Sequence, residues 1–166
     1  MALRAVEIPD ITTTDHIGLD ALESAPLRLG YAYWRSLRGD RPYPSRSDIR
    51  PRDIAGILRH VSLLKFENGD FVHRIVGDAI VRAFDIPLQN RTVSELAAEE
   101  PGFVALLRPL LEQCRVTGEP FAIRGQTGRD IFRITFSHHE AVFLPLGPDA
   151  ATVDHVLVVS SLFSRS

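Results

Sequence analysis

The sequence is almost without cysteine, since Cys114 is the one cysteine among 166 residues. A lone thiol forms no internal disulfide, and it lacks the partner thiols of a cysteine-rich zinc site. Secreted folds held by disulfides and zinc-ribbon modules are therefore excluded. Because Cys114 falls within a stretch of helical periodicity, we expect it to be a small buried apolar side chain. A single cysteine suits a reducing compartment, so the sequence predicts a cytoplasmic protein.

Long hydrophobic runs and a strong charge of one sign are also missing. Glu7 and Asp10 interrupt the N-terminal stretch where a signal peptide needs apolar residues, and the apolar runs elsewhere are short. The formal net charge is -2, from 19 basic and 21 acidic residues. We therefore expect no membrane-spanning segment, no membrane partner and no nucleic-acid partner.

The common sequence motifs of catalysis and metal binding are missing as well. The chain has no Gly-x-Ser-x-Gly nucleophile elbow and no glycine-rich phosphate loop. Its six histidines include no His-x-His or Glu-x-x-His pair, and no Cys-x-x-Cys-His haem attachment occurs. The sequence predicts no catalytic residue, no metal site and no cofactor. Noncovalent haem or metal stays open as an alternative, with His73 or His138 as the ligand.

The sequence does contain enough apolar material for one domain. Hydrophobic residues make up 45% of the chain, and 166 residues can bury one full-sized core. Residues 1–23 lack sustained periodicity and are interpreted as an N-terminal arm, whereas 24–166 form the domain. An amphipathic helix is predicted over 26–37.

The order of the remaining elements defines the fold class. Two apolar runs, 60–67 and 71–76, flank Asn68-Gly69-Asp70, which is typical of a tight hairpin. Short helices are predicted after Gly77, followed by a longer helix over 101–116. Three strands come last, and their short connections make them antiparallel neighbours; they are predicted over 120–125, 131–144 and 153–163. The sequence thus predicts an α+β fold, with a five-stranded antiparallel sheet, helices on one face and an N-terminal amphipathic helix.

Four segments resemble a family of small single-domain bacterial proteins with the PAS fold. They are residues 33–39 with Arg41-Pro42 and Pro44, residues 48–49 with 53–54, residues 71–77, and residues 143–146. The resemblance extends over about 27–163 and implies a PAS-like domain that acts as a non-catalytic sensory module. PAS domains hold small ligands or bind proteins. The turn over 85–91 departs from the glycine-rich turn usual in the family, but Asn90 can take the left-handed conformation there.

The resemblance also suggests where a ligand would lie, because PAS ligands occupy the space between the sheet and the helices. Strand alternation predicts that Phe71, His73 and Ile75 face this space. We expect the complete lining to be Phe71, His73, Ile75, Phe84, Phe103, Leu107, Phe132, Ile134 and Phe136. Their aromatic character indicates a small, mostly apolar ligand. For His73, a hydrogen-bonded core histidine is the alternative interpretation.

The predicted helix over 26–37 exposes too much apolar surface to remain free in water. It can pack on its own sheet, on the face opposite the other helices, or on a second copy of the chain. We expect a homodimer with Leu27, Tyr31 and Trp34 at the interface. Because no output domain fits in the remaining residues, we expect signals to pass to an unidentified partner protein by noncovalent association.

Two further hypotheses stay open. A small cone-shaped α+β enzyme could use Asp154 and His155 as an acid–base pair, although neighbours on a strand point apart. The stretch 35–60 contains seven arginines and three aspartates, so it could receive an anion. The alternative for that stretch is a solvated loop whose arginines bond to nearby carboxylates and carbonyls.

Overall fold

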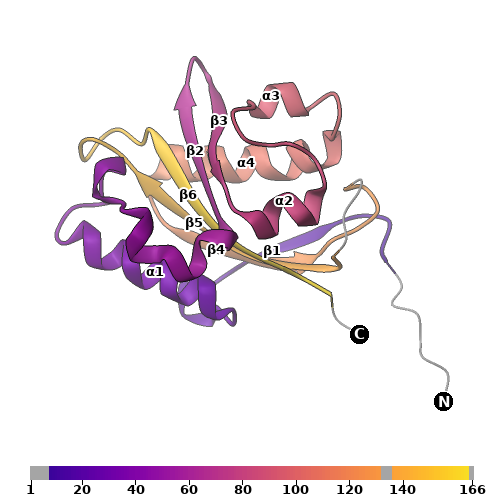
Figure 1. Cartoon of the computed structure of the whole chain (residues 1–166), viewed down its shortest axis with the longest axis horizontal. Coiled ribbons are helices and arrows are strands. Elements are labelled where there is room, and N and C mark those ends of the chain that lie inside the picture. The colour runs from indigo at the N-terminus through magenta and orange to yellow at the C-terminus, as the bar shows by residue number, and fades with distance from the viewer. Residues whose placement is uncertain (1–7, 132–135, 165–166) are drawn as a thin grey trace.

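A six-stranded antiparallel sheet forms the centre of the molecule in this computed structural model, which describes residues 8–131 and 136–164. The spatial order of the strands is β1-β4-β5-β6-β2-β3 (Figure 1). Their bounds are β1 Thr13–Ile17, β2 Val61–Glu67, β3 Asp70–Val76, β4 Phe121–Gln126, β5 His138–Leu146 and β6 His155–Phe163. The predicted α+β class and antiparallel sheet are confirmed, and the number of strands is six rather than five.

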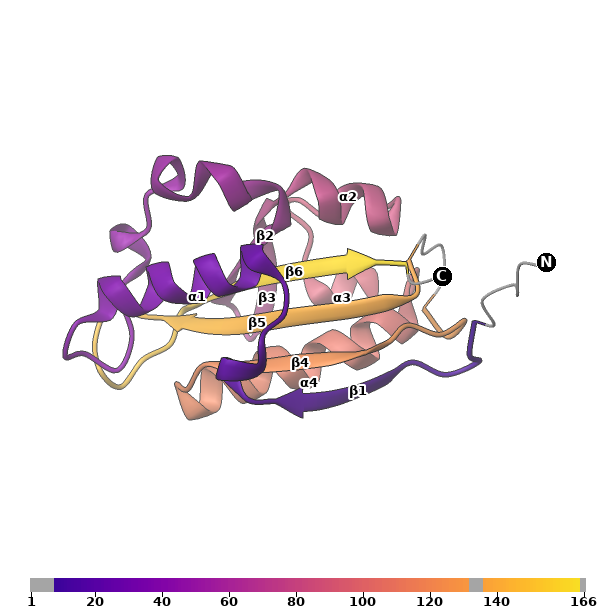
Figure 2. The ribbon, with the colours of Figure 1, turned by 90° about the horizontal axis from the view of Figure 1, so that it is seen from below.

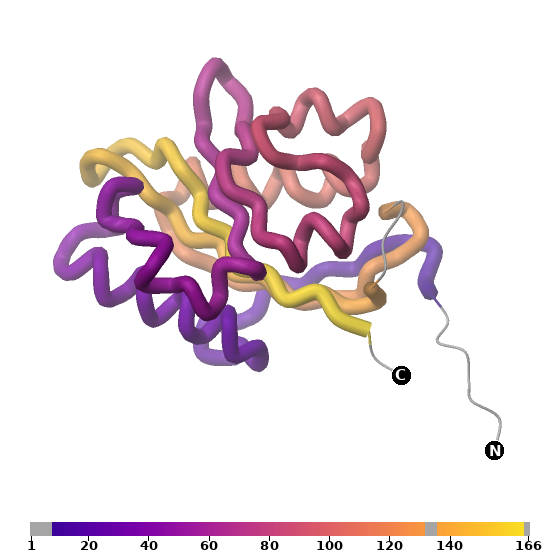
Figure 3. Tube along the Cα trace, in the orientation of Figure 1, coloured from indigo at the N-terminus to yellow at the C-terminus, as the bar shows by residue number. Residues whose placement is uncertain are grey.

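The additional strand comes from the segment interpreted as an arm. β1 pairs with β4 over its whole length, from Thr13 opposite Gln126 to Ile17 opposite Ala122. Only five residues long, β1 is half-exposed and carries mixed polar residues, so it lacks the apolar alternation that identifies a strand in a sequence. Figure 3 follows the chain from β1 at the sheet edge towards α1.

One face of the sheet is covered by α2 (Asp78–Phe84), α3 (Val93–Leu96) and α4 (Pro101–Thr117). Their apolar side chains join those of the strands in one cluster, which includes Phe84, Leu96, Leu111, Phe143 and Val156. α4 begins at Pro101 and ends at Thr117, and its C-cap is Gly118, which has a positive φ of 64°. These boundaries match the sequence prediction for the longest middle helix.

The opposite face carries α1 (Ala25–Arg38) and the 3-10 helix η3 (Pro51–His60), as Figure 2 shows from below. The short 3-10 turns η1 (Leu19–Ala21) and η2 (Arg46–Asp48) flank α1 in the chain. α1 approaches β6 so closely that a Cβ added to Gly30 would lie 2.8 Å from Val159 Cγ2. The helix predicted over 26–37 therefore packs on its own sheet.

This packing places two of the three expected interface residues inside the monomer. Leu27 and Trp34 are each 0% exposed, and the Trp34 indole Nε1–H donates to the Pro145 carbonyl oxygen at 2.8 Å. Tyr31 stays half-buried at the surface. The apolar stripe that motivated a helix-mediated dimer is thus mostly used in the intramolecular core.

The β2–β3 hairpin closes as predicted, with Asn68 and Gly69 both at positive φ. Its register, however, shifts between Leu63 and Leu64: Leu63 lies opposite Ile75 and Leu64 lies opposite His73, which leaves Arg74 as an extra residue. The bulge turns Ile75 to the face covered by α1. There Ile75 packs against a second cluster of buried apolar side chains, which includes Leu27 and Trp34. Simple alternation along β3 was wrong for this residue.

Within the residues that the structure describes, no helix combines the length and the hydrophobicity needed to span a membrane.

Candidate ligand cavity

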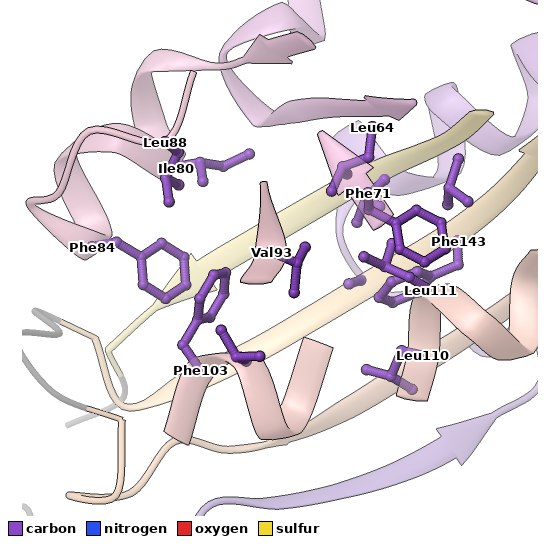
Figure 4. Packing of buried hydrophobic residues seen from close by; sticks show 14 of the residues in the cluster. Leu64, Phe71, Ile80, Phe84, Leu88, Val93, Phe103, Leu110, Leu111 and Phe143 are labelled. Atoms are coloured by element: carbon purple, nitrogen blue, oxygen red, sulfur yellow. The ribbon is translucent and has the colours of Figure 1, made fainter. Parts of the chain in front are cut away.

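A cavity of about 90 Å³ lies between the sheet and the helices α2 and α4. Most of its walls are apolar side chains of the first cluster, part of which Figure 4 shows. The side chains from helices and loops are Ile80, Phe84, Leu88, Phe103, Leu106, Leu107, Leu110, Thr127, Ile131 and Phe136. Those from strands are Ser62, Leu64, His73, Ile123, His139, Ala141, Phe143, Val158, Ser160 and Leu162.

The structure brings together five of the side chains expected to line this space: His73, Phe84, Phe103, Leu107 and Phe136. Phe71 is buried in the same cluster but does not reach the cavity. Ile75 lies on the other face because of the bulge in the hairpin. Phe132 and Ile134 lie outside the described residues.

Three aromatic rings in the cavity wall contact one another. Phe84 of α2 and Phe103 of α4 face each other with ring centroids 4.6 Å apart (Figure 4). Phe84 also meets Phe136 edge-on, at 5.5 Å and 82°. Such tilted and edge-to-face contacts are favourable beyond the area they bury. This part of the wall is therefore well packed and apolar.

His73 supplies a polar group to the cavity wall. Its Nδ1–H donates to the Arg91 carbonyl oxygen at 3.1 Å, because a carbonyl can only accept. Burial lowers the pKa of His73, and the charge of Arg91 lowers it further, against the opposing effect of that hydrogen bond. A neutral imidazole with its proton on Nδ1 leaves Nε2 as an acceptor. His73 is thus both a hydrogen-bonded core histidine and a residue of the cavity wall.

The backbone of β3 fixes the position of His73. The His73 N–H donates to the Arg91 carbonyl oxygen at 3.0 Å, and the Asn90 N–H donates to the His73 carbonyl oxygen at 2.7 Å. Asn90 has a positive φ of 64°, the left-handed conformation that an asparagine can take in this turn. The turn before α3 therefore pairs with the outer edge of β3 and holds the imidazole against the cavity.

His139 is the second cavity histidine, and sequence reasoning missed it. Thr14 Oγ1 lies 2.6 Å from its Nε2, and Thr127 Oγ1 lies 3.0 Å from its Nδ1. A neutral imidazole donates through one nitrogen and accepts through the other, and hydroxyls can serve both. Burial lowers the pKa of His139 to about 4, with a smaller contribution from His138.

Alternation within β5 places His139 on the cavity side. β5 begins only at His138, and within it His139, Ala141 and Phe143 all line the cavity. Counting backwards from Phe143 inside the strand would have found His139. His138 points to the opposite face, where its ring stacks on Phe163 at 5.7 Å and 18°.

Hydroxyl groups add the remaining polarity of the cavity wall. Ser62, Thr127 and Ser160 line it, and none of them carries a charge. No aspartate or glutamate occurs among the described lining residues. Across the described part of the chain, no three His, Cys, Asp or Glu side chains gather in a way that could hold a metal ion. The cavity suits a neutral, mostly apolar molecule with few polar groups.

The Asp154 and His155 side chains of the alternative enzyme hypothesis contact each other, but away from the cavity. His155 Nδ1 lies 2.9 Å from Asp154 Oδ1, although alternation on a strand predicted that these neighbours point apart. Asp154 directly precedes β6, and its backbone already bonds to the neighbouring strands: its N–H donates to the Leu146 carbonyl oxygen at 3.0 Å, and its carbonyl oxygen accepts from the Phe66 N–H at 2.8 Å. Neither side chain lines the cavity.

Among known proteins, the chain matches a family model. No curated protein and no solved structure matches the chain. A family model described as PAS domain matches residues 22–159. This range includes every helix from α1 to α4, both candidate histidines and most of the sheet. The chain belongs to the PAS domain family.

Proposed function

We propose that this PAS domain is a sensory module without catalysis of its own, and that it responds to a small, mostly apolar ligand held between the sheet and α4. Membership of the PAS family supports a sensory or signalling role. The observation that carries the proposal is the cavity of about 90 Å³. Close-packed cores have few voids much larger than a water molecule.

The size of the cavity limits the ligand. A dry apolar cavity of about 150 Å³ binds benzene or xenon. A molecule that occupies this space without rearrangement is therefore smaller than benzene. The Nε2 acceptor of His73 could receive one hydrogen bond from it.

Xenon is a suitable probe because it needs no polar partner. We expect saturable ¹²⁹Xe chemical-shift changes on titration of the wild-type protein. Leu107→Phe should abolish them, because Leu107 is a half-buried cavity residue whose larger replacement fills the space. Val116→Phe is the matched control on the same helix, since Val116 is 71% exposed and does not line the cavity. An unsaturable shift in the wild type would refute ligand sensing through this cavity.

A ligand-dependent signal has to reach another part of the signalling system. We therefore propose noncovalent association with a signalling partner or with a second copy of the chain. On α1, the surface left for such contact includes Leu29, which is 60% exposed, and the half-buried Tyr31. Sedimentation of the wild type and of Leu29→Glu tests self-association through this surface. If the chain self-associates there, the wild type is a dimer and the variant is a monomer.

A further inference from the structure

A second hollow of about 250 Å³ lies directly outside the cavity, between the end of η3, α2 and the end of β6. It is lined by Arg59, His60, Ala79, Ile80, Arg82, Ala83, Phe136, Ser160, Leu162, Phe163 and Ser164. We refer to it as the outer hollow. It shares Ile80, Phe136, Ser160 and Leu162 with the cavity, so these side chains are the wall between the two spaces.

The outer hollow is positively charged, whereas the cavity is not. Arg59 and Arg82 line it, and no aspartate or glutamate is among its described lining residues. Arg82 Nη2 contacts Asp78 Oδ2 at 3.1 Å, but this pair is largely exposed and only weakly coupled in water. Arg59 forms no ion pair with any carboxylate in the described part of the chain. One guanidinium is therefore available to an anion.

The other polar groups of the outer hollow are neutral. His60 Nδ1–H donates to the Ser160 carbonyl oxygen at 3.2 Å. Burial lowers the pKa of His60, the Ser160 hydrogen bond opposes that shift, and Arg59 adds to it. The positive charge of the outer hollow thus comes from its two arginines, and the rest of its lining is mostly apolar.

From this arrangement we infer that the ligand of the sensor is an amphipathic anion, namely an aliphatic carboxylate of medium chain length. Its carboxylate pairs with Arg59 in the outer hollow, and its hydrocarbon chain passes the shared wall into the cavity. This inference rests on the proposed function, because it uses the same cavity. Entry requires the Ile80 and Leu162 side chains to change rotamer, which leaves the backbone hydrogen bonds of β6 intact.

The two spaces complement such a molecule in both charge and polarity. Guanidinium groups pair with carboxylates through charge-assisted hydrogen bonds, often two in parallel. Hydrocarbon in an apolar cavity gains affinity with every methylene that it buries. The cavity alone admits only a molecule smaller than benzene, whereas a hydrocarbon chain that extends from the outer hollow into the cavity occupies both spaces.

Calorimetric titration of the full chain with octanoate and with 1-octanol separates the charge from the hydrocarbon. We expect octanoate to bind about tenfold more tightly than 1-octanol, as for one charge-assisted hydrogen bond. Arg59→Gln should remove this difference. Arg52→Gln is the matched control, because Arg52 lies on the same 3-10 helix, is exposed and does not line the outer hollow. Equal affinities for the two compounds in the wild type would overturn the inference.

Chain length and xenon competition test the position of the tail. From hexanoate to octanoate, affinity should rise about fourfold for each methylene buried. Octanoate should also displace xenon from the cavity. Octanoate binding that leaves the xenon shifts unchanged would place the hydrocarbon chain outside the cavity. It would then refute the proposal that the ligand extends from the outer hollow into the cavity. Saturable xenon binding without octanoate binding would defeat this inference alone, whereas failure of both would defeat the proposed function as well.

Discussion

Thr14 of the edge strand β1 and His139 of β5 are joined through Thr14 Oγ1 and His139 Nε2, 2.6 Å apart. β4 lies between their two strands, so this contact crosses one strand of the sheet. Because His139 also lines the cavity, it connects the outermost strand to the ligand space. The segment before β1 is tied down as well: Thr12 Oγ1 donates to Asp130 Oδ1 at 2.7 Å.

Removal of the Thr14 hydroxyl should therefore destabilise the protein. Thr14→Val keeps the β-branched shape but leaves a buried imidazole nitrogen without its partner, which costs about 1–3 kcal/mol. The neighbouring Thr13 is exposed and belongs to the other side of β1, so Thr13→Val should change stability by less than about 0.5 kcal/mol. Urea unfolding of both variants measures the difference. Equal stabilities would show that the contact contributes nothing.

Trp34 provides a test of where α1 belongs. The side chain is 0% exposed and hydrogen-bonds to Pro145, so Trp34→Ala should cost about 3–5 kcal/mol and Trp34→Glu should prevent folding. Trp34→Phe retains most of the packing and should lose much less. Circular dichroism and sedimentation velocity measure the outcome. A folded Trp34→Glu monomer produced from a wild-type dimer would instead restore the interface prediction.

Glu140 joins β5 to the start of α1. Its carboxylate is 2% exposed on the side chain and accepts the Ser24 N–H at 2.9 Å, and Arg124 Nη2 donates to it at 2.7 Å. The Ser24 side chain itself makes no capping hydrogen bond, so this carboxylate from a distant strand serves the helix N-terminus.

Glu140→Gln should cost about 2–4 kcal/mol, because it leaves the Arg124 charge without its buried partner. Glu95→Gln is the comparison, since its ion pair with Arg91 is 3.9 Å long and the Glu95 side chain is 56% exposed. That surface change should cost less than about 1 kcal/mol. Thermal unfolding of both variants distinguishes the two. A loss at Glu140 no larger than that at Glu95 would contradict a role in holding α1.

Local signals in the sequence predicted several elements well. The apolar stripe before Gly39 predicted α1, Asn68-Gly69 predicted the hairpin, and the spacing of leucines before Gly118 predicted α4. Each of these signals is contained in a short window, where helical period or turn chemistry acts directly on the backbone. The cavity residues Phe84, Phe103 and Leu107 followed from the same periodicity.

The misplaced residues depend on contacts between distant segments. Ile75 changes face because the bulge is a property of the β2–β3 pairing, which no single strand encodes. Contacts between distant segments likewise decide whether the apolar stripe of α1 packs on its own sheet or on a second copy of the chain. β1 is polar and gains its strand conformation by pairing with β4, more than a hundred residues later in the chain. Periodicity carries no information about such partners.

The buried histidines make stability depend on pH. The pKa of His139 is about 4 in the folded protein and that of an unfolded histidine is about 6.5, so between these values the unfolded chain binds the additional proton. Stability is therefore complete above about pH 6.5 and falls as the pH decreases towards 4. The shift corresponds to about 3 kcal/mol for His139. His73 and His60 act in the same direction, because burial lowers the pKa of each.

Urea unfolding at a series of pH values from about 7.5 to about 4.5 measures this dependence as the slope of the unfolding free energy against pH. His139→Gln should fold less stably at neutral pH but show a shallower slope. His16→Gln is the matched control, because His16 lies at the exposed surface, where its side chain is bonded to Gln113 at 2.9 Å, and does not line the cavity. The lowered pKa values of Asp48 and Asp70 act only below their ordinary value near 3.9, outside this window. A slope in His139→Gln equal to that of the wild type would show that His139 is not the group that titrates.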